Sequence, residues 1–441
     1  MRKGRATNRM SGGRLLAVAV AVAVASALPV AWAADTTSGT SPGPTVVSDQ
    51  DGGRTWYHEV PSEPMGTLLM LHRCGRNAED FWPPSSVCPQ CIGMPEGVSI
   101  SRQGLARGYA LLAINSLNRT LGSGGRCFSW ADDAFAVRDI VAGFQKKQGL
   151  EKLPLYITGC SSGGSVALRI PSIMKVDGLM PVAIGLDLQA FPPSNPWPEN
   201  HTYPPTAYIH FSRDKTISAQ VAAMLEFSAN ASLPTAEVKE VPAAIDPAFF
   251  SRRDAMISEE LSRALYTALK EDLQVLDDSD FLKENWQQLV SQTQLQEKLR
   301  SVLASGGAVA ASSLDGGDGG GGAAAEVVQL PADRLMDLVN HVQEEVAVAW
   351  AEHTNLGDYT TAVLMWLEGG GKGDFAQLAK AHRVTEPAAL AAPGIRNDNV
   401  PSSAVAPPGL PPPAPSNAAR RGRWAAATAA VAAAALALVL L

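Results

Sequence analysis

The sequence lacks the features of a nucleic-acid-binding protein. Its 36 Lys and Arg residues are outnumbered by 43 Asp and Glu residues, and the formal net charge is −7. No stripe of basic residues with interleaved aromatic residues occurs, although such a stripe is what binds a phosphate backbone and stacks on bases. We therefore expect no nucleic acid among the partners.

Cysteine is scarce, with five residues at Cys74, Cys88, Cys91, Cys127 and Cys160. Only one Cys-x-x-Cys pair is present, and neither a second pair nor a nearby pair of histidines completes a zinc site. We expect no metal and no cofactor, and we expect a structural role for Cys88 and Cys91. In a secreted chain, five cysteines predict up to two disulfides and one remaining thiol.

Hydrophobic residues make up 46% of the chain and charged residues 18%, which is sufficient for one large core. Short apolar and β-branched runs alternate with helical stretches. Strands are predicted at 66–71, 108–115, 153–158, 178–186, 206–212 and 236–241, with a helix at 131–147. This alternation is typical of βαβ units, so the predicted fold class is α/β, with a mainly parallel sheet covered on both faces.

The start of the chain predicts entry into the secretory pathway. Residues 1–33 combine a basic segment, an apolar run and a small-x-small cleavage site, which is the pattern of a signal peptide. A short transmembrane helix is the alternative, but the apolar run falls short of the ~20 residues of a membrane span. Three sequons, at Asn118, Asn200 and Asn230, are candidate N-glycosylation sites.

The end of the chain predicts a membrane tether. Residues 424–441 form an apolar tail, and small residues at 416–418 offer an attachment site for a glycolipid anchor once the tail is removed. A retained tail helix is the alternative. It would leave the arginines at 420–423 on the lumenal side, against the positive-inside tendency, so we favour the removed tail. Both routes predict an extracellular or cell-surface protein.

Composition also divides the chain into segments. A helical insertion is expected where helical spacing replaces strand character, after the last predicted strand. The expected segments are a signal peptide (1–33), a linker (34–54), an α/β core (55–246), the helical insertion (247–304), a Gly-rich loop (305–325), the C-terminal part of the core (326–380), a Pro/Ala-rich linker (381–423) and the apolar tail (424–441).

A Gly-x-Ser-x-Gly motif centred on Ser161 stands in the stretch YITGCSSGGSVAL. A predicted strand precedes it and a helix start follows it. A serine hydroxyl is a weak nucleophile, and a tight turn between small residues lifts it towards a base. Gly159 and Gly163 meet that need, so Ser161 is the candidate nucleophile. An ordinary turn without chemistry is the alternative.

A nucleophilic serine needs a general base, and the base needs an acid that fixes its tautomer. Asp214 follows a predicted strand, where open α/β sheets carry such groups, and is the candidate acid. Capping of the next helix is an alternative role for Asp214, and Asp187 is the alternative acid. Among seven histidines, His353 at a helix end is the candidate base. His341 lies mid-helix, where a solvated or packing role is expected.

Acyl transfer also requires two backbone N–H groups aimed at the developing oxyanion. One is expected from Ser162, directly after the nucleophile. The other is expected from the loop after strand 66–71, with Cys74 as the candidate and Arg73 as the alternative.

Several stretches together resemble a known family. LLMLHRCGRNAEDFW, LARGYALLAINS, GRCFSWADD, LYITGCSSGGSVAL and HFSRDKTIS are similar to α/β-hydrolase esterases related to polyhydroxybutyrate depolymerases and feruloyl esterases, and still more to uncharacterised hydrolases of plants and green algae. The resemblance covers residues 66–368. It implies the α/β-hydrolase fold and carboxylic-ester hydrolysis with Ser161, Asp214 and His353 as the triad. It also implies a disulfide between Cys74 and Cys127.

The chain departs from these esterases at two positions. Arg73 stands where they usually have glycine, and Cys160 stands where alanine or leucine is common. Arg73 either narrows the site or binds a substrate carboxylate, and we expect it to narrow the site. The sequence thus predicts a secreted or cell-surface serine hydrolase that cleaves esters through an acyl-enzyme. The alternatives are amide hydrolysis and a surface binding protein that keeps the fold without catalysis.

Overall fold

The computed structural model describes residues 43–48, 54–120, 125–188, 202–285, 288, 295–304 and 332–391. The predicted signal peptide, the Gly-rich loop, the apolar tail and Asn200 lie outside these ranges. Among the described residues, no helix combines the length and the apolar character needed to cross a membrane.

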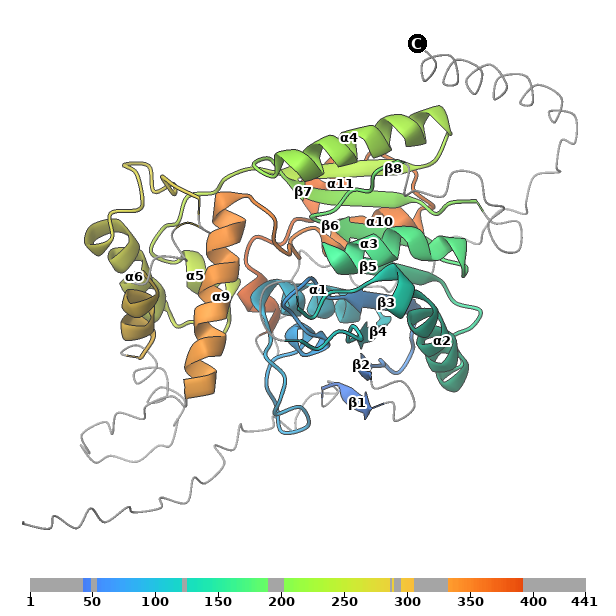
Figure 1. Cartoon of the computed structure of the whole chain (residues 1–441), viewed down its shortest axis with the longest axis horizontal. Helices are drawn as coiled ribbons and strands as arrows, with labels where there is room; N and C mark the ends of the chain where they lie inside the picture. Colours follow the sequence, from blue (N-terminus) through green and yellow to red (C-terminus); the bar gives the residue numbers. More distant parts are fainter. Residues whose placement is uncertain are drawn as a thin grey trace, which may run out of the picture.

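One eight-stranded sheet forms the centre of the molecule, with strand order β1-β2-β4-β3-β5-β6-β7-β8 (Figure 1). The strands are β1 (Thr45–Ser48), β2 (Thr55–Glu59), β3 (Gly66–Leu71), β4 (Tyr109–Ile114), β5 (Leu155–Cys160), β6 (Gly178–Val182), β7 (Thr206–Phe211) and β8 (Thr235–Glu240). β2 pairs antiparallel with β1 and β4, and the other pairs are parallel. The parallel strands therefore end at one common edge, where ligand sites of such sheets lie.

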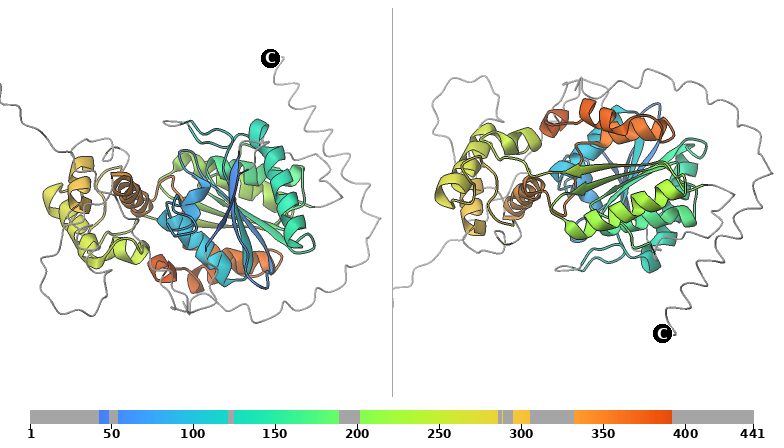
Figure 2. Two further views of the ribbon diagram at one scale, coloured as in Figure 1. Left: turned by 90° about the horizontal axis from the view of Figure 1, so that it is seen from below. Right: turned by 90° about the horizontal axis from the view of Figure 1, so that it is seen from above.

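The central strand shows why helices cover both faces. In β3, Leu68 and Met70 belong to one buried cluster, whereas Leu69 and Leu71 belong to another, as the alternation of side chains along a strand requires. The first cluster includes residues of α1 (Pro95–Ala106), α10 (Thr360–Glu368) and α11 (Phe375–Ala381), and the second includes residues of α2 (Trp130–Gln148), α3 (Ser162–Arg169) and α4 (Lys215–Asn230). Figure 2 shows the sheet between these two helical layers. This is the α/β-hydrolase fold that the sequence predicts.

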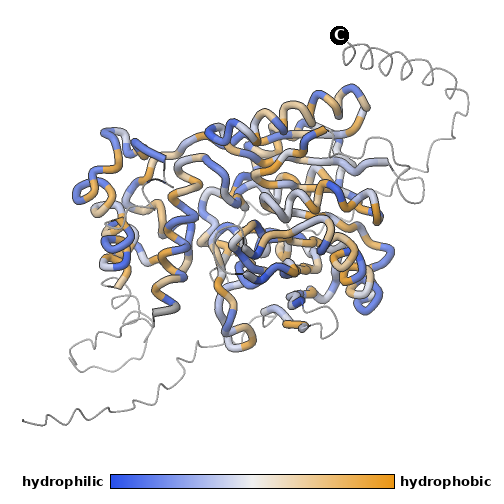
Figure 3. The backbone as a smooth tube through the Cα atoms, in the orientation of Figure 1, coloured by the Kyte–Doolittle hydropathy of each residue, from blue (hydrophilic) through white to orange (hydrophobic). Residues whose placement is uncertain are grey.

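The helical insertion has an apolar cluster of its own. It contains α5 (Phe249–Arg253), α6 (Glu259–Thr267), the π-helical turn η4 (Ala268–Asp272), the helical residues 295–304 and much of α9 (Ala332–Trp350). Along α9, hydrophobic and hydrophilic residues alternate as expected for a helix with one buried face (Figure 3). We expected α9 to belong to the hydrolase core, but most of its buried side chains pack within the insertion.

Two expected boundaries differ from the structure. β1 lies inside the segment 34–54 that composition marks as a linker, because four residues suffice to pair with β2 at the sheet edge. The folded part also continues past Lys380. Val384 is buried, and the Arg383 guanidinium bonds to Asp358 and Glu240 at 3.0 Å. Polar contacts of this kind leave no trace in the local hydrophobic pattern.

A buried guanidinium joins the insertion to the core. Arg253 of α5 bonds to Glu96 of α1, to Glu345 of α9 and to Asp358, with an Arg253 Nη2 to Asp358 Oδ1 distance of 2.8 Å. The three carboxylate side chains are fully buried. Because Asp358 lies five residues after His353, this network also fixes the end of the loop that carries His353.

Candidate active site

Ser161 lies at the sharp turn between β5 and α3. Its backbone has φ 52° and ψ −113°, a conformation that residues with a side chain rarely adopt. The Ser161 amide donates to the Val182 carbonyl at 3.0 Å, which fixes the turn against β6. This conformation is the sharp strand-to-helix turn that the motif predicts.

The glycines around Ser161 are required by close backbone contacts. A Cβ atom at Gly159 would lie 2.6 Å from the carbonyl carbon of Gly163, and one at Gly163 would lie 2.5 Å from the carbonyl oxygen of His72. The absence of side chains therefore lets the start of α3 rest directly on the end of β3. This contact brings the nucleophile and the loop after β3 together.

The structure brings the three predicted triad residues into contact. His353 Nε2 lies 2.8 Å from Ser161 Oγ, and His353 Nδ1 lies 2.8 Å from Asp214 Oδ2. His353 is about one third exposed, with a side-chain exposure of 35%, so its ring remains accessible from solvent. The geometry satisfies the requirement that base and nucleophile lie within hydrogen-bond reach.

Asp214 has both roles that the sequence analysis weighed against each other. Its Oδ1 accepts a hydrogen bond from the Ile217 amide at 3.0 Å and caps α4, while its Oδ2 binds His353. Burial acts to raise the pKa of Asp214, but the hydrogen bonds from His353 and from the Ile217 amide outweigh it, so the pKa lies below its usual value. Asp214 therefore stays ionised and holds the Nδ1 proton of His353.

The alternative histidines are engaged elsewhere. His341 is fully buried, and its Nδ1 lies 2.8 Å from Asp254 of the insertion. His210, inside β7, contacts Glu237 at 2.9 Å. Neither forms a hydrogen bond with Ser161.

A second contact joins the loops of the acid and the base, and the sequence analysis did not foresee it. The Arg213 guanidinium carbon lies 3.3 Å from the centroid of the Trp350 ring. The Arg213 amide also donates to the Ala351 carbonyl at 3.2 Å. Arg213 directly precedes Asp214, and Trp350 lies three residues before His353. This closeness in the chain is the only feature of the sequence that indicates the contact.

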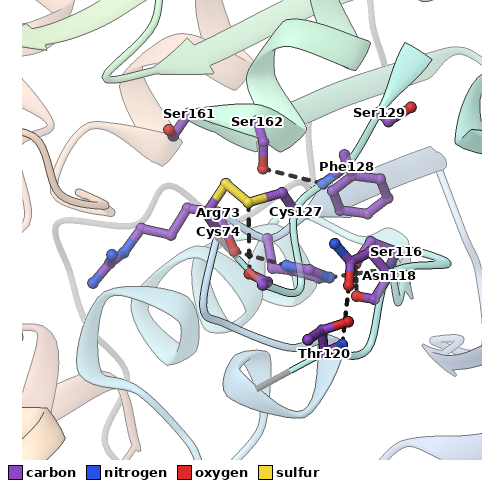
Figure 4. Close-up of a disulfide and its surroundings, with 12 residues drawn as sticks. Arg73, Cys74, Ser116, Asn118, Thr120, Cys127, Phe128, Ser129, Ser161 and Ser162 are labelled. Atoms are coloured by element: carbon purple, nitrogen blue, oxygen red, sulfur yellow. Dashed lines mark hydrogen bonds between the residues drawn. A yellow bond between two sulfur atoms is a disulfide. The ribbon is translucent and has the colours of Figure 1, made fainter. Parts of the chain in front are cut away.

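The two candidate oxyanion residues are held together by covalent and hydrogen bonds (Figure 4). Cys74 forms a disulfide with Cys127, the pairing that the family resemblance implies. The next amide, that of Phe128, donates to Ser162 Oγ at 3.3 Å. The loop after β3 and the start of α3 are thus joined next to Ser161.

His72 orients this loop, a role that the sequence analysis did not assign. Its Nε2 accepts from the Ser116 amide at 3.1 Å, so its Nδ1 carries the proton and donates to the Arg73 carbonyl at 2.9 Å. Burial lowers the pKa of His72 to about 3, which keeps the ring neutral. The carbonyl and N–H of one trans peptide point in opposite directions, so fixing the Arg73 carbonyl also fixes the Cys74 N–H.

The remaining predicted residues are the other cysteines and the candidate glycosylation sites. Cys88 and Cys91 form a second disulfide, consistent with the expected structural role. Cys160 is buried with a free thiol, and burial raises its pKa to about 12. Asn118 and Asn230 are exposed. No group of three or more His, Cys, Asp or Glu side chains among the described residues is arranged to hold a metal ion.

Comparison with known proteins identifies similarity at the level of structure only. No family model matches the chain, and no curated protein matches it. Among solved structures, the chain is similar to an esterase of Pyrobaculum calidifontis, with 12% identity, 45% of this chain and 74% of that chain covered, and a TM-score of 0.30.

Two further structures are similar to the chain at the same level. Carboxyl esterase 2 of Tuber melanosporum shares 13% identity, with 46% of this chain and 78% of that chain covered and a TM-score of 0.32. A serine hydrolase without lid from Xanthomonas campestris shares 14% identity, with 46% and 84% covered and a TM-score of 0.31. The chain is thus similar in structure to esterases and to a serine hydrolase.

Proposed function

We propose that this protein is a serine hydrolase that cleaves carboxylic esters through an acyl-enzyme. The observation that carries the proposal is the position of His353, with one ring nitrogen 2.8 Å from Ser161 Oγ and the other 2.8 Å from Asp214. Three side chains from separate loops meet in the order that general-base activation of a serine requires.

The proposed reaction has two halves. In the first, His353 Nε2 takes the proton of Ser161 as Oγ attacks the ester carbonyl, and Asp214 stabilises the imidazolium. The amides of Cys74 and Ser162 stabilise the oxyanion, and the alcohol leaves with the proton from His353. In the second half, His353 activates a water molecule, which releases the acid and regenerates Ser161.

The test is hydrolysis of 4-nitrophenyl acetate and butyrate by the purified protein. Ser161→Ala and His353→Ala are each expected to lower kcat/KM by roughly 10³-fold or more, because removing one triad member disables the unit. Ser165→Ala, one turn further along α3, is the matched control and should retain activity. Wild-type rates in Ser161→Ala would refute the proposal.

The proposal includes a location at the cell surface, which the sequence of both ends supports. If the tail is exchanged for a glycolipid, phosphatidylinositol-specific phospholipase C should release the protein from intact cells. A protein that stays membrane-bound after this treatment and keeps residues 424–441 would instead have a tail helix.

A further inference from the structure

A small cavity lies next to the loop that follows β3. Its lining includes Arg73 and Arg76 from that loop, Met94 next to α1, and Glu344 from α9. Cys160 also lines it and directly precedes Ser161. The cavity therefore reaches the turn that carries Ser161, while Ser161 itself does not line it.

The two arginines of this cavity have no acidic partner at ion-pair distance. In the described part of the chain, no carboxylate oxygen lies within 4.0 Å of the side-chain nitrogens of Arg73 or Arg76. Arg73 Nε is buried and has no hydrogen-bond partner, and Arg76 Nη1 contacts only the sulfur of Met94, at 3.4 Å. A guanidinium stays protonated in proteins, so both positive charges persist.

Two acidic side chains face the same cavity, but they bind backbone amides instead. Asp80 Oδ2 accepts from the Asn77 amide at 3.1 Å, and Glu344 Oε2 accepts from the Glu96 amide at 3.3 Å. Burial raises the pKa of Asp80 to about 6, so this carboxyl is still mostly ionised at pH 7. Asp80 and Glu344 favour the charged form of Arg73 through space, but neither forms an ion pair with it, and the buried Arg73 Nε–H is left without an acceptor.

The place of Arg73 in the chain relates this cation to catalysis. Its carbonyl is held by His72, and the N–H of the same peptide belongs to Cys74, a proposed oxyanion donor. Figure 4 shows the Arg73 side chain extending away from the disulfide, while Ser161 lies above the loop. One short segment therefore carries both a proposed oxyanion donor and a planar guanidinium. A guanidinium can donate two parallel hydrogen bonds to the two oxygens of a carboxylate.

We infer that this cavity is an anion subsite and that the preferred substrates are esters carrying a free carboxylate, bound by Arg73 with Arg76 beside it. The inference rests on the proposed ester hydrolysis and names its substrate class. It favours carboxylate binding over the narrowing role that the sequence analysis expected of Arg73.

The first test compares substrates that differ in one charge. In the first pair, monoethyl adipate carries a free carboxylate on its acyl side and ethyl hexanoate is the neutral counterpart. In the second pair, O-butyryl glycolate carries the carboxylate on its alcohol side and propyl butyrate is the neutral counterpart. The wild type should prefer the anionic member of one pair by about 10- to 100-fold in kcat/KM, the range expected for a charge-assisted hydrogen bond. The pair that shows the preference identifies the side. Equal rates within both pairs would overturn the inference.

The second test uses variants to ask whether the arginines of the cavity cause the preference for anionic esters. Arg73→Gln should lower the ratio of anionic to neutral kcat/KM about tenfold or more, Arg73→Lys should lower it less, and Arg76→Gln should lower it as well. Arg138→Gln is the matched control, because it removes the same charge from an exposed pair with Asp139 on α2. A ratio that falls equally in the control would show a long-range charge effect and contradict the subsite.

A binding measurement separates this inference from the proposed reaction. In Ser161→Ala, calorimetric titration with adipate and with O-butyryl glycolate reports the subsite without any turnover. Binding of either that is lost in Ser161→Ala/Arg73→Gln supports the subsite even if no ester is hydrolysed. Absence of binding by both ligands, in protein that is folded by circular dichroism, would refute the subsite even if neutral esters are hydrolysed.

Discussion

His353 Nδ1 lies 2.8 Å from Asp214 Oδ2, and the other oxygen of the same carboxylate caps α4. One side chain thus sets the orientation of the base and anchors the helix that follows it. The two roles can be separated by substitution.

Asp214→Asn should retain the cap but lose catalysis. An asparagine oxygen can still accept from the Ile217 amide, whereas its NH₂ group would face His353 and favour the wrong tautomer. We expect kcat to fall by about 10³- to 10⁴-fold. Urea unfolding should show little loss of stability, whereas Asp214→Ala should lose about 1 kcal/mol more because the cap disappears. Near-wild-type activity in Asp214→Asn would contradict the role of Asp214.

Gly163→Ala should disrupt the contact between α3 and β3. The added Cβ would lie 2.5 Å from the carbonyl oxygens of both Leu71 and His72, and backbone must move to accommodate it. We expect a loss of roughly 2 kcal/mol or more in unfolding free energy, together with a loss of activity. Gly143→Ala in α2 is the matched control, because its Cβ would meet no atom within 4 Å. The control should stabilise the helix by about 0.5 to 1 kcal/mol.

His72 should make the protein sensitive to acid. Its pKa is 6.5 in the unfolded chain and about 3 when buried, so below pH 6.5 the unfolded state binds a proton that the folded state does not. Stability is therefore complete above pH 6.5 and falls as the pH decreases towards 3, by about 3 kcal/mol at pH 4.5 from this residue alone.

His72→Asn removes this titration. The variant should be less stable than the wild type at pH 7, since two buried hydrogen bonds are altered, but the difference should narrow by about 3 kcal/mol at pH 4.5. Urea unfolding at both pH values measures it. An equal difference in unfolding free energy between the two proteins at both pH values would rule out the lowered pKa of His72.

The sequence predicts the sheet and the triad because both depend on local patterns. Runs such as Leu68 to Leu71 identify buried strands, and Gly159 and Gly163 mark the turn around Ser161. The position of Asp214 after a strand marks it as the candidate acid. These features are encoded within a few neighbouring residues, so the family resemblance and the residue patterns agree on them.

Long-range polar contacts were not predictable in the same way. Arg253 meets Glu96, which lies 157 positions earlier in the chain, and nothing near either residue indicates the pairing. The hydrogen bond between His72 and its own neighbour's carbonyl depends on how the loop after β3 turns. Periodicity reports which face of an element is buried, but it does not report which charges meet.

Arg253→Met should destabilise the junction between insertion and core. It would leave the carboxylates of Glu96 and Glu345 buried without their cation, whereas Asp358 would keep its ion pair with Arg383, and we expect a cost of about 3 to 5 kcal/mol at pH 7. Burial already raises the pKa of Glu96 and Glu345, so protonation should reduce this cost at pH 5.

The neighbouring Arg252→Met is the matched control for Arg253→Met. Arg252 pairs with Asp246 in a solvent-accessible ion pair, at 35% and 47% exposure, and should cost no more than about 1 kcal/mol. Equal losses in the two variants, measured by urea unfolding, would show that the buried network contributes nothing specific.

Fluorophosphonate labelling shows whether Ser161 is an activated nucleophile, as we propose. We predict that the wild-type protein is labelled, that mass spectrometry places the adduct on Ser161, and that both Ser161→Ala and His353→Ala lose the label. A folded wild-type protein that resists labelling would contradict the claim and favour a surface binding protein that has kept the α/β-hydrolase fold without its chemistry.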